Sequence, residues 1–268
     1  MMNNPQRSLK SEIRFAIEHG FEVFELTLEP PNAHPGSLDL AQLRRRLRSS
    51  GLEVLGHTAY YLPFASPFEE VREAALEVLF RCLETFAHLE VRRVTVHPDP
   101  SVKGIFSEEE ILNLNIEGFA RLVERGRELG IQILLENLTH HLGTPANLQR
   151  ILEAVPGLGW TLDIAHANLG VAQNRTPELL RVLGHRLQHV HISDNNGGTS
   201  DLHLPIGAGK IPWHIQFRRL HEARYNGTLT LEVFSQEREY LLLSRRKVQE
   251  LLEKLRIPIE EGWTDSEE

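Results

Sequence analysis

The sequence contains little cysteine and no long apolar segment. Cys82 is the only cysteine among 268 residues, so the chain has no second thiol with which to form an internal disulfide. No run reaches the roughly 18 consecutive apolar residues that a membrane-spanning helix needs. The polar residues of Met1–Lys10 lack the apolar core of a signal peptide. We therefore expect a cytoplasmic protein with no membrane partner and no disulfide-linked partner.

Positive charge is also in short supply. Lysine and arginine number 29 against 37 aspartates and glutamates, which gives a formal net charge of -8. This balance excludes a globally basic surface for nucleic acid or anionic membranes, although a local basic patch is still compatible with it. The basic run Arg44–Arg46 falls in a predicted helix, where a solvated outer face is the simpler interpretation.

The sequence is rich instead in short apolar segments that alternate with longer segments of helical periodicity. This alternation is typical of β-α-β units and a parallel sheet. Seven apolar segments are predicted as strands, at residues 21–28, 52–58, 93–97, 131–137, 159–166, 188–194 and 228–234. Helices are predicted near residues 8–19, 38–50, 68–88, 107–129, 145–154, 176–184, 212–224 and 236–255.

The steady spacing of these elements predicts one domain over residues 1–268, ending in an acidic tail at 260–268. We expect an α/β fold of the TIM-type (β/α)8 barrel class, in which eight parallel strands form the inner ring. Only seven strands are visible, so the first strand is predicted to be missing, very short or contained in Met1–Pro5. An open doubly wound sheet is the alternative, but the sequence has no glycine-rich fingerprint after an early strand and no P-loop.

Six of the predicted strands end in a residue that can bind a metal ion. These residues are His57, His97, Glu136, Asp163, His191 and Glu232. A single histidine or glutamate at a strand end is more often an ordinary rim residue than a ligand. The carboxyl ends of the strands of a parallel barrel, however, meet at one mouth, where active sites are built. Because a buried carboxylate is costly unless it is paired or metal-bound, six convergent residues favour a metal centre.

Three further residues follow closely. His166 lies three residues after Asp163, while Asp201 and His203 are separated by one residue, which places them on the same side of an extended segment. Imidazole and carboxylate together suit Zn²⁺, Mn²⁺ and related ions. A single ion takes about four to six ligands. Nine donors therefore predict two or three ions that share bridging carboxylates.

The order of these residues resembles the xylose-isomerase-like superfamily, and within it the endonuclease IV family of zinc-dependent apurinic/apyrimidinic (AP) endonucleases. The similarity runs from Glu12 to Glu232. The matching motifs are His57-Thr58-Ala59-Tyr60, His97-Pro98, Glu136-Asn137, Asp163-Ile164-Ala165-His166, His191-Ile192-Ser193-Asp194, Asp201-Leu202-His203 with Gly207-Ala208-Gly209, and Glu232. All nine metal positions of the family pattern are filled.

The resemblance implies three divalent metal ions per chain, either zinc or manganese. The implied ligand sets are His57, His97 and Glu136 for one ion, Glu136, Asp163, His191 and Glu232 for a second, and His166, Asp201 and His203 for a third. The implied reaction is hydrolysis of a phosphodiester, in abasic-site DNA or in a small phosphorylated sugar, with the ions stabilising charge on the phosphate oxygens. The implied catalytic residues are Glu136, Glu232 and His166.

The resemblance is weaker outside the metal motifs. The polar first strand of the family has no visible counterpart, and the loops that carry its DNA-wedging side chains are shorter here. Tyr60 is a candidate substrate contact, either as a wedge together with Tyr61 or as rim packing. Lys210 follows the Gly-x-Gly loop and is a second candidate, for contact with a phosphate. His189 is interpreted as a core histidine or as a partner that supports His191.

Sugar and sugar-phosphate isomerases and epimerases of the same superfamily resemble the chain equally well from His191 to Gly209. They hold one ion, and the corresponding ligands here are Glu136, Asp163, His191 and Glu232. In that alternative Glu136 and Glu232 exchange a proton beside a carbonyl group, and His166 orients the substrate. A third possibility is a barrel that keeps its metal ligands only for binding or structure. The hydrolase is the preferred hypothesis.

Overall fold

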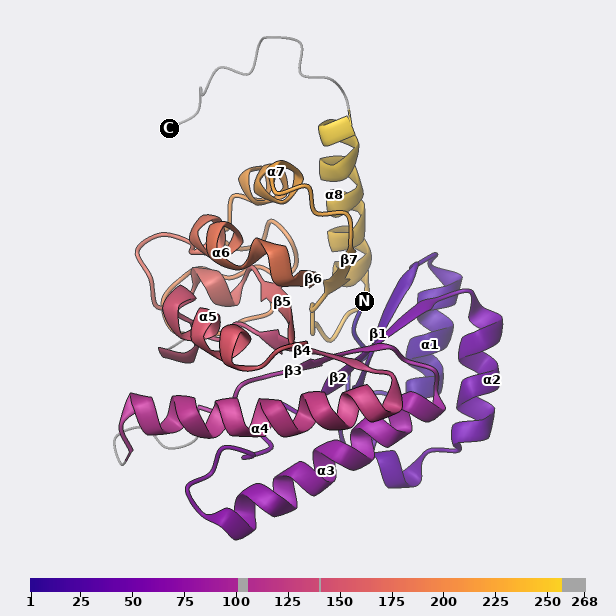
Figure 1. Cartoon of the computed structure of the whole chain (residues 1–268). Coiled ribbons are helices and arrows are strands. Elements are labelled where there is room, and N and C mark those ends of the chain that lie inside the picture. The colour runs from indigo at the N-terminus through magenta and orange to yellow at the C-terminus, as the bar shows by residue number, and fades with distance from the viewer. Residues whose placement is uncertain (101–105, 140, 257–268) are drawn as a thin grey trace.

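The backbone forms a ring of parallel strands inside a layer of helices (Figure 1). The computed structural model describes residues 1–100, 106–139 and 141–256, and the predicted acidic tail lies outside these ranges. The strands are β1 (Val23–Leu28), β2 (Glu53–Thr58), β3 (Arg93–Val96), β4 (Gln132–Glu136), β5 (Gly159–Asp163), β6 (Leu187–Ile192) and β7 (Thr228–Leu231). Each strand pairs in parallel with the next one in the sequence.

Helices cover the outside of this ring and link each strand to the next (Figure 1). They are α1 (Leu9–Glu18), α2 (Leu40–Ser50), α3 (Glu69–His88), α4 (Glu108–Leu129), α5 (Pro145–Ala154), α6 (Thr176–Leu183), α7 (Trp213–Glu222) and α8 (Glu239–Arg256). Four short 3-10 turns complete the pattern: η1 (Pro35–Ser37), η2 (His141–Gly143), η3 (His166–Asn168) and η4 (Gly184–Arg186). Within the described ranges, no helix combines the length and the apolar character that crossing a membrane requires.

A three-residue segment, Met1–Asn3, lies between β7 and β1 and takes the place of an eighth strand. The Met2 N–H donates to the Leu231 carbonyl at 3.2 Å, and the Asn3 N–H donates to the Glu25 carbonyl at 3.1 Å. Met2 and Glu25 form a single parallel bridge. The predicted TIM-type barrel is therefore confirmed, with a first strand that is very short.

Local sequence fixes where the long helix α4 begins and ends. The Ser107 hydroxyl accepts a hydrogen bond from the Glu110 N–H at 3.2 Å, and the Glu110 carboxylate accepts one from the Ser107 N–H at 2.8 Å. This reciprocal capping satisfies two amide groups that the helix itself leaves unpaired. Gly130 ends the helix with a φ of 68°, a left-handed conformation that glycine adopts without strain. Strand β4, which carries Glu136, starts two residues later.

The strand side chains alternate between an outer apolar core and the barrel interior. On β6, Val190 and Ile192 are completely buried in the core between sheet and helices, whereas His189 and His191 alternate with them and face inward. In this outer core, β2 packs closely against α3. A Cβ atom at Gly56 would lie 2.7 Å from the ring of Phe86 on α3, so β2 and α3 pack this closely only because residue 56 is glycine.

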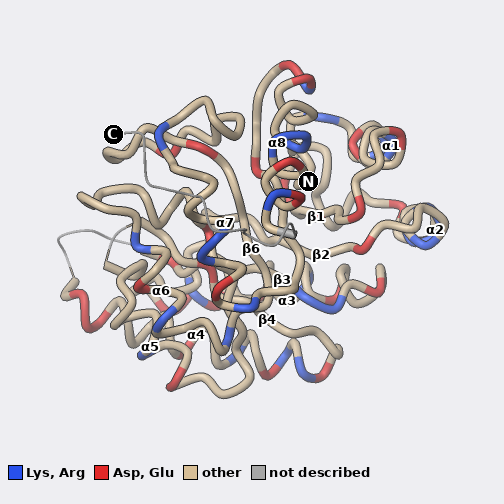
Figure 2. Tube along the Cα trace, turned by 90° about the horizontal axis from the view of Figure 1, so that it is seen from above, with Lys and Arg blue, Asp and Glu red and all other residues tan. Residues whose placement is uncertain are grey.

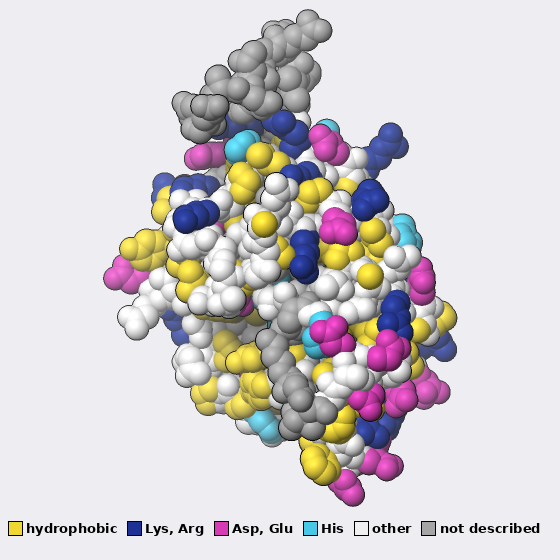
Figure 3. Space-filling model, turned by 90° about the vertical axis from the view of Figure 1, so that its left-hand side faces the viewer, with side chains coloured by type: hydrophobic (Ala, Val, Ile, Leu, Met, Phe, Trp, Pro, Cys, Tyr) yellow, Lys and Arg dark blue, Asp and Glu magenta, His cyan; other side chains and the backbone are white. Residues whose placement is uncertain are grey.

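Charged residues lie mostly on the outer helices, where acidic and basic positions are interspersed along the backbone (Figure 2). Arg121 on α4, for example, donates to the Glu73 carboxylate on α3 at 2.8 Å. Figure 3 shows the face on the left of Figure 1, where lysine and arginine side chains are scattered singly among acidic and apolar ones. This face carries no continuous basic patch among the residues that the structure describes.

Candidate metal centre

The structure brings the six residues predicted at strand ends into one cluster at one end of the barrel. Because side chains alternate along a strand, the last inward-facing position of each strand lies in the same layer. Those positions are His57 on β2, Glu136 on β4, Asp163 on β5 and His191 on β6, with His97 and Glu232 directly after β3 and β7. Five of the six residues are buried, and His97 is half-buried.

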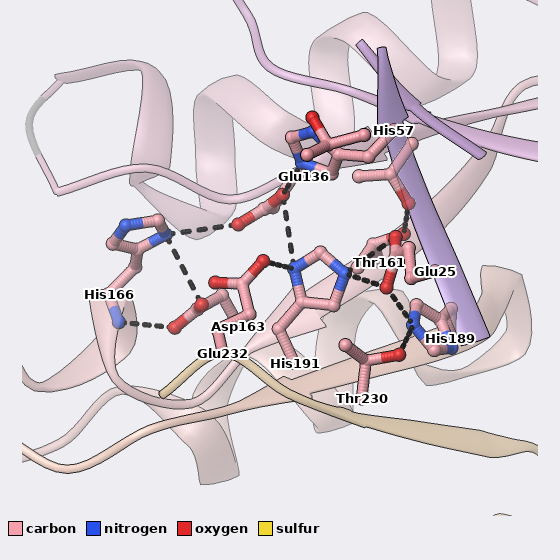
Figure 4. Close-up of polar contacts among 12 residues, drawn as sticks. Glu25, His57, Glu136, Thr161, Asp163, His166, His189, His191, Thr230 and Glu232 are labelled. Carbon is pink, nitrogen blue, oxygen red and sulfur yellow. Dashed lines mark hydrogen bonds and ion pairs between the residues drawn. The ribbon is translucent and has the colours of Figure 1, made fainter. Parts of the chain in front are cut away.

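Glu136 lies at the centre of this cluster (Figure 4). Its Oε2 atom is 2.9 Å from Nε2 of His97, 3.3 Å from Nε2 of His57 and 3.3 Å from Nδ1 of His191. Its Oε1 atom is 3.2 Å from Nδ1 of His166. One buried carboxylate is thus surrounded by four imidazoles from different parts of the chain.

Two groups of donor atoms share this carboxylate. The first comprises His57, His97 and Glu136, and the second comprises Glu136, Asp163, His191 and Glu232; within each group the donor atoms lie within 4.8 Å of one another. In the second group, Nδ1 of His191 is 3.1 Å from Oε1 of Glu232. The Glu136 carboxylate therefore belongs to two overlapping groups of side chains that could each hold a cation.

The remaining three predicted donors also lie together, at the edge of the cluster. The Oδ2 atom of Asp201 is 3.0 Å from Nε2 of His166 and 3.0 Å from Nε2 of His203. His166 joins these residues to the strand-end cluster through its Nδ1 contact with Glu136. Asp201 and His203 are more exposed than the strand residues, because they lie on the loop between β6 and α7.

Asp194, just after β6, holds that loop against the barrel. The buried Asp194 carboxylate accepts hydrogen bonds from the N–H groups of Gly207 at 2.7 Å and Ile211 at 3.2 Å, and from the Trp213 indole at 3.0 Å. Any side chain at Gly209 would collide with this carboxylate. The motif Gly207-Ala208-Gly209 therefore allows a close approach that fixes the position of the donors preceding it in the loop.

His203 adopts an unusual backbone conformation in the same loop. Its φ of 44° lies in the left-handed region, which only a few per cent of non-glycine residues occupy, although histidine is found there more often than most. The next residue, Leu204, is fixed by two backbone hydrogen bonds with Asp194, at 2.8 and 2.9 Å. The Nδ1 atom of His203 lies 3.1 Å from the Glu232 carbonyl. Backbone strain of this kind is typical of functional sites, where the surroundings hold the conformation in place.

The electrostatics of the cluster favour positive charge among the carboxylates. Burial raises the pKa of Glu232 to about 7, and the neighbouring carboxylates of Glu136 and Asp163 act in the same direction. Burial opposes charge on His203 as well, but the Asp201 carboxylate outweighs this effect and raises the pKa of His203 to about 9. Burial also raises the pKa of Asp163. Each shift has the sign expected of several acids that share a small buried volume.

The cluster opens into a cavity of about 780 Å³. His57, His97, His166, Asp201, His203 and Glu232 line it, together with residues from the barrel rim that include Glu29, Tyr60 and Phe234. The predicted substrate contact Tyr60 therefore borders the cavity, with 63% of its surface exposed. Lys210 is exposed and is not among the residues that line the cavity, so the structure does not bring this predicted phosphate contact to the site.

Sequence reasoning missed Glu25, a completely buried glutamate on β1. Its Oε2 atom lies 3.0 Å from Nε2 of His189 and 3.1 Å from Nε2 of His191. The signal was a charged residue in the middle of the apolar strand segment Phe24-Glu25-Leu26. Glu25 lies within its strand rather than at the strand end, so a search for donors at strand ends does not find it.

The donor set fits divalent metal ions. Among the described residues, the buried atoms Oε1 of Glu136, Oδ2 of Asp163 and Nδ1 of His191 have no hydrogen-bond partner. Buried polar atoms are almost always satisfied in native proteins, so unsatisfied ones call for an explanation such as an ion. Mixed imidazole and carboxylate donors suit Zn²⁺, Mn²⁺ or Fe²⁺.

Comparison with known proteins places the chain in a family. A sequence model of the xylose isomerase-like TIM barrel family matches residues 13–257, and the chain belongs to that family. An uncharacterized protein of Methanocaldococcus jannaschii is 32% identical over 263 residues, covering 91% of this chain and 88% of the relative.

Two further relatives carry names that indicate different activities. A probable endonuclease 4 of Thermosipho melanesiensis is 28% identical over 225 residues, covering 72% of this chain and 76% of the relative. The crystal structure of a D-tagatose 3-epimerase-like protein superimposes with a TM-score of 0.82 and 30% identity, covering 93% of this chain and 95% of that one. The chain is therefore similar to proteins named for both classes of enzyme that its sequence suggests.

Proposed function

We propose that this chain is a divalent-metal-dependent hydrolase that cleaves a phosphodiester, in abasic-site DNA or in a smaller sugar-phosphate ester. The observation that carries the proposal is the number and sharing of donors. Nine imidazole and carboxylate side chains form three linked groups around one cavity, with Glu136 common to two of them. One ion uses about four to six ligands, so this set suits three ions.

The charge of the site links the number of ions to the class of substrate. The nine donors include four carboxylates, those of Glu136, Asp163, Asp201 and Glu232. None of the described residues that line the cavity is lysine or arginine. With one divalent ion, two negative charges are left over, and they repel a phosphate. Counted over these nine donors, three ions leave two positive charges. Each ion also offsets the nearby carboxylates of Glu25 and Glu29, so a phosphodiester is repelled less with every ion that binds.

The chain's own residues have distinct roles in this proposal. Divalent ions at such a site stabilise negative charge on phosphate oxygens and lower the pKa of nearby water. Glu136 belongs to both strand-borne donor groups and would hold their two ions close together. Glu232 lines the cavity beside Nδ1 of His191 and is placed to exchange a proton with the reacting groups. His166 lies between Glu136 and Asp201 and links the strand donors to the loop donors.

Epimerisation or isomerisation of a sugar is the second candidate, and a specific observation favours it. The group Glu136, Asp163, His191 and Glu232 is by itself complete for one ion, and it places two glutamates at the same centre. A one-ion site that retains negative charge suits an uncharged sugar. The likeness to a D-tagatose 3-epimerase-like protein over 93% of the chain supports this candidate.

Two assays on the same protein separate the candidates. Protein loaded with Zn²⁺ or Mn²⁺ is incubated with a duplex that carries one abasic site, with an intact duplex as control, and in parallel with a panel of free and phosphorylated ketoses. We expect cleavage of the abasic duplex, loss of cleavage with a chelator, and no cleavage of the intact duplex. The hydrolase proposal would be overturned if the protein epimerised ketoses but cleaved neither the abasic duplex nor small phosphodiesters.

A further inference from the structure

Beneath the metal donors, the barrel interior contains a second layer of polar side chains. Glu25 of β1 reaches across this layer to β6, where both of its oxygens lie 3.1 Å from Nε2 of His191 (Figure 4). Its Oε2 atom is also 3.0 Å from Nε2 of His189. All three side chains are completely buried. Glu25 faces the ring of His191 from the side opposite to Glu136 and Glu232, which contact Nδ1.

The hydrogen-bond directions in this layer follow from the carboxylate. A carboxylate only accepts hydrogen bonds, so the nitrogens within hydrogen-bond distance of it must carry hydrogens. Nε2 of His191 therefore donates to Glu25. When the ring is neutral, as a metal ligand must be, the lone pair is on Nδ1.

That lone pair points at two carboxylates. Nδ1 of His191 lies 3.3 Å from Oε2 of Glu136 and 3.1 Å from Oε1 of Glu232, and it has no hydrogen-bond partner. A lone pair facing two anions in a buried site is repulsive unless a cation lies among them. The side of the ring that Glu25 leaves open must therefore carry either a proton or a metal cation among these carboxylates.

We propose that Glu25 is a positioning residue that fixes His191 as an Nδ1 ligand of the ion shared with Glu136, Asp163 and Glu232. This inference rests on the metal centre proposed above, but not on the reaction that the centre performs. A carboxylate behind a metal-binding imidazole orients the ring and increases its basicity. Because Glu25 is completely buried, its negative charge also acts on the ion with little screening by water.

The same layer supplies a matched control. His189 completes the network, with Nδ1 2.7 Å from the Thr228 hydroxyl and Nε2 3.1 Å from the Thr230 hydroxyl. Thr230 is as deeply buried as Glu25, and its hydroxyl contacts His189 rather than His191. Thr230→Val removes one polar contact from the layer while leaving the contact between Glu25 and His191 in place.

The experiment compares Glu25→Gln, Thr230→Val and the unaltered protein by zinc titration against a competing chelator, with circular dichroism to check folding. We expect Glu25→Gln to weaken the binding of one ion by about 10- to 100-fold, the range found for residues behind a ligand. Thr230→Val should bind zinc like the unaltered protein. Unchanged zinc affinity in Glu25→Gln, or an equal loss in Thr230→Val, would overturn the assignment.

A measurement on the unaltered protein covers the case in which Glu25→Gln does not fold. The ¹⁵N chemical shifts of histidine rings in zinc-loaded protein distinguish Nδ1 from Nε2 coordination, and the spectrum of His191→Asn identifies the relevant signals. We expect Nδ1 coordination and an Nε2–H group for His191, whereas Nε2 coordination would contradict the proposal. Zinc binding by the unaltered protein tests the metal centre separately. If the unaltered protein binds no zinc, the metal centre is wrong; if it binds zinc and Glu25→Gln binds zinc equally well, only the role of Glu25 is wrong.

Discussion

The strand-borne and loop-borne parts of the candidate centre are built differently. Glu136, Asp163 and His191 lie on hydrogen-bonded strands and are completely buried. The loop residues Asp201 and His203 have side chains that are 32% and 25% exposed. The barrel itself holds the strand donors in place, whereas the loop donors depend on the docking of their loop. The positions of the strand donors therefore follow from the barrel fold, whereas the positions of Asp201 and His203 follow from the packing of one loop.

This difference corresponds to the two candidate functions. The strand donors contain a complete set for one ion, which either reaction can use. In the proposed hydrolase, the loop donors and His166 would hold the third ion and so supply positive charge that attracts a phosphodiester. Changes confined to one part should therefore separate the two functions.

The largest effect is expected from Glu136→Gln, because this residue belongs to both strand-borne donor groups. The amide retains the size of the side chain but removes the negative charge that two cations share. We expect metal binding at both strand sites to fall by more than the roughly 100-fold lost when an outer partner is removed, and activity of either kind to disappear. Metal content and turnover measure this. Unchanged metal content in Glu136→Gln would show that the Glu136 carboxylate is not a metal ligand common to the two groups.

His203→Ala should affect only the loop-borne part. The side chain contacts Asp201 and borders the cavity without belonging to either strand-borne group. We expect one ion fewer per chain, no phosphodiester cleavage, and only weakened epimerisation if that reaction occurs. The measurements are ion content and the two assays run side by side. Undiminished phosphodiesterase activity would refute the assignment of His203 to a third ion.

Asp194→Asn tests how the loop donors are held. Each oxygen of the Asp194 carboxylate accepts two hydrogen bonds, and an amide nitrogen in place of one oxygen would face two donors. We expect the affinity for the loop-borne ion to fall by about tenfold, in line with other residues that orient ligands, while the strand-borne ions are retained. Chelator titration resolves the two classes of ion. Equal weakening of all ions would mean that the loop and the strands are not independent.

The smallest effect is expected from Lys210→Ala. Lys210 is exposed and is not among the residues that line the cavity. Substitutions at such surface positions usually change the free energy of unfolding by less than about 0.5 kcal/mol. Ion content, thermal stability and turnover should all stay close to those of the unaltered protein. A large rise in KM for a phosphorylated substrate would instead restore Lys210 as a phosphate contact.

Much of the strand-borne part could be predicted from the sequence, because it depends on local regularities. Strands alternate inward and outward positions, and parallel strands end at the same mouth, so His57, Glu136 and Asp163 could be expected to meet. The barrel was likewise predicted from the spacing of strands and helices. The sequence does not predict that Met1–Asn3 pairs with both neighbouring strands, because three residues are too few to show a strand pattern.

The rest depends on contacts between distant segments. Glu25 lies across the barrel from His191, and no spacing along the chain connects the two residues. The docking of the loop by Asp194 depends on amides that follow it by 13 and 17 positions in a loop without regular structure. Lys210 was expected near a phosphate because of its place after a glycine motif, but the direction of a loop side chain cannot be inferred from that position.

The number of metal ions per chain tests the central claim most directly. The protein is purified without chelator, supplied with zinc or manganese, freed of loosely bound metal and measured by elemental analysis against protein concentration. Three tightly bound ions per chain are predicted, falling to two in His203→Ala. A single ion in the unaltered protein would contradict the three-ion centre and favour the epimerase, and no bound ion would contradict the assignment of the strand-end cluster as a metal site.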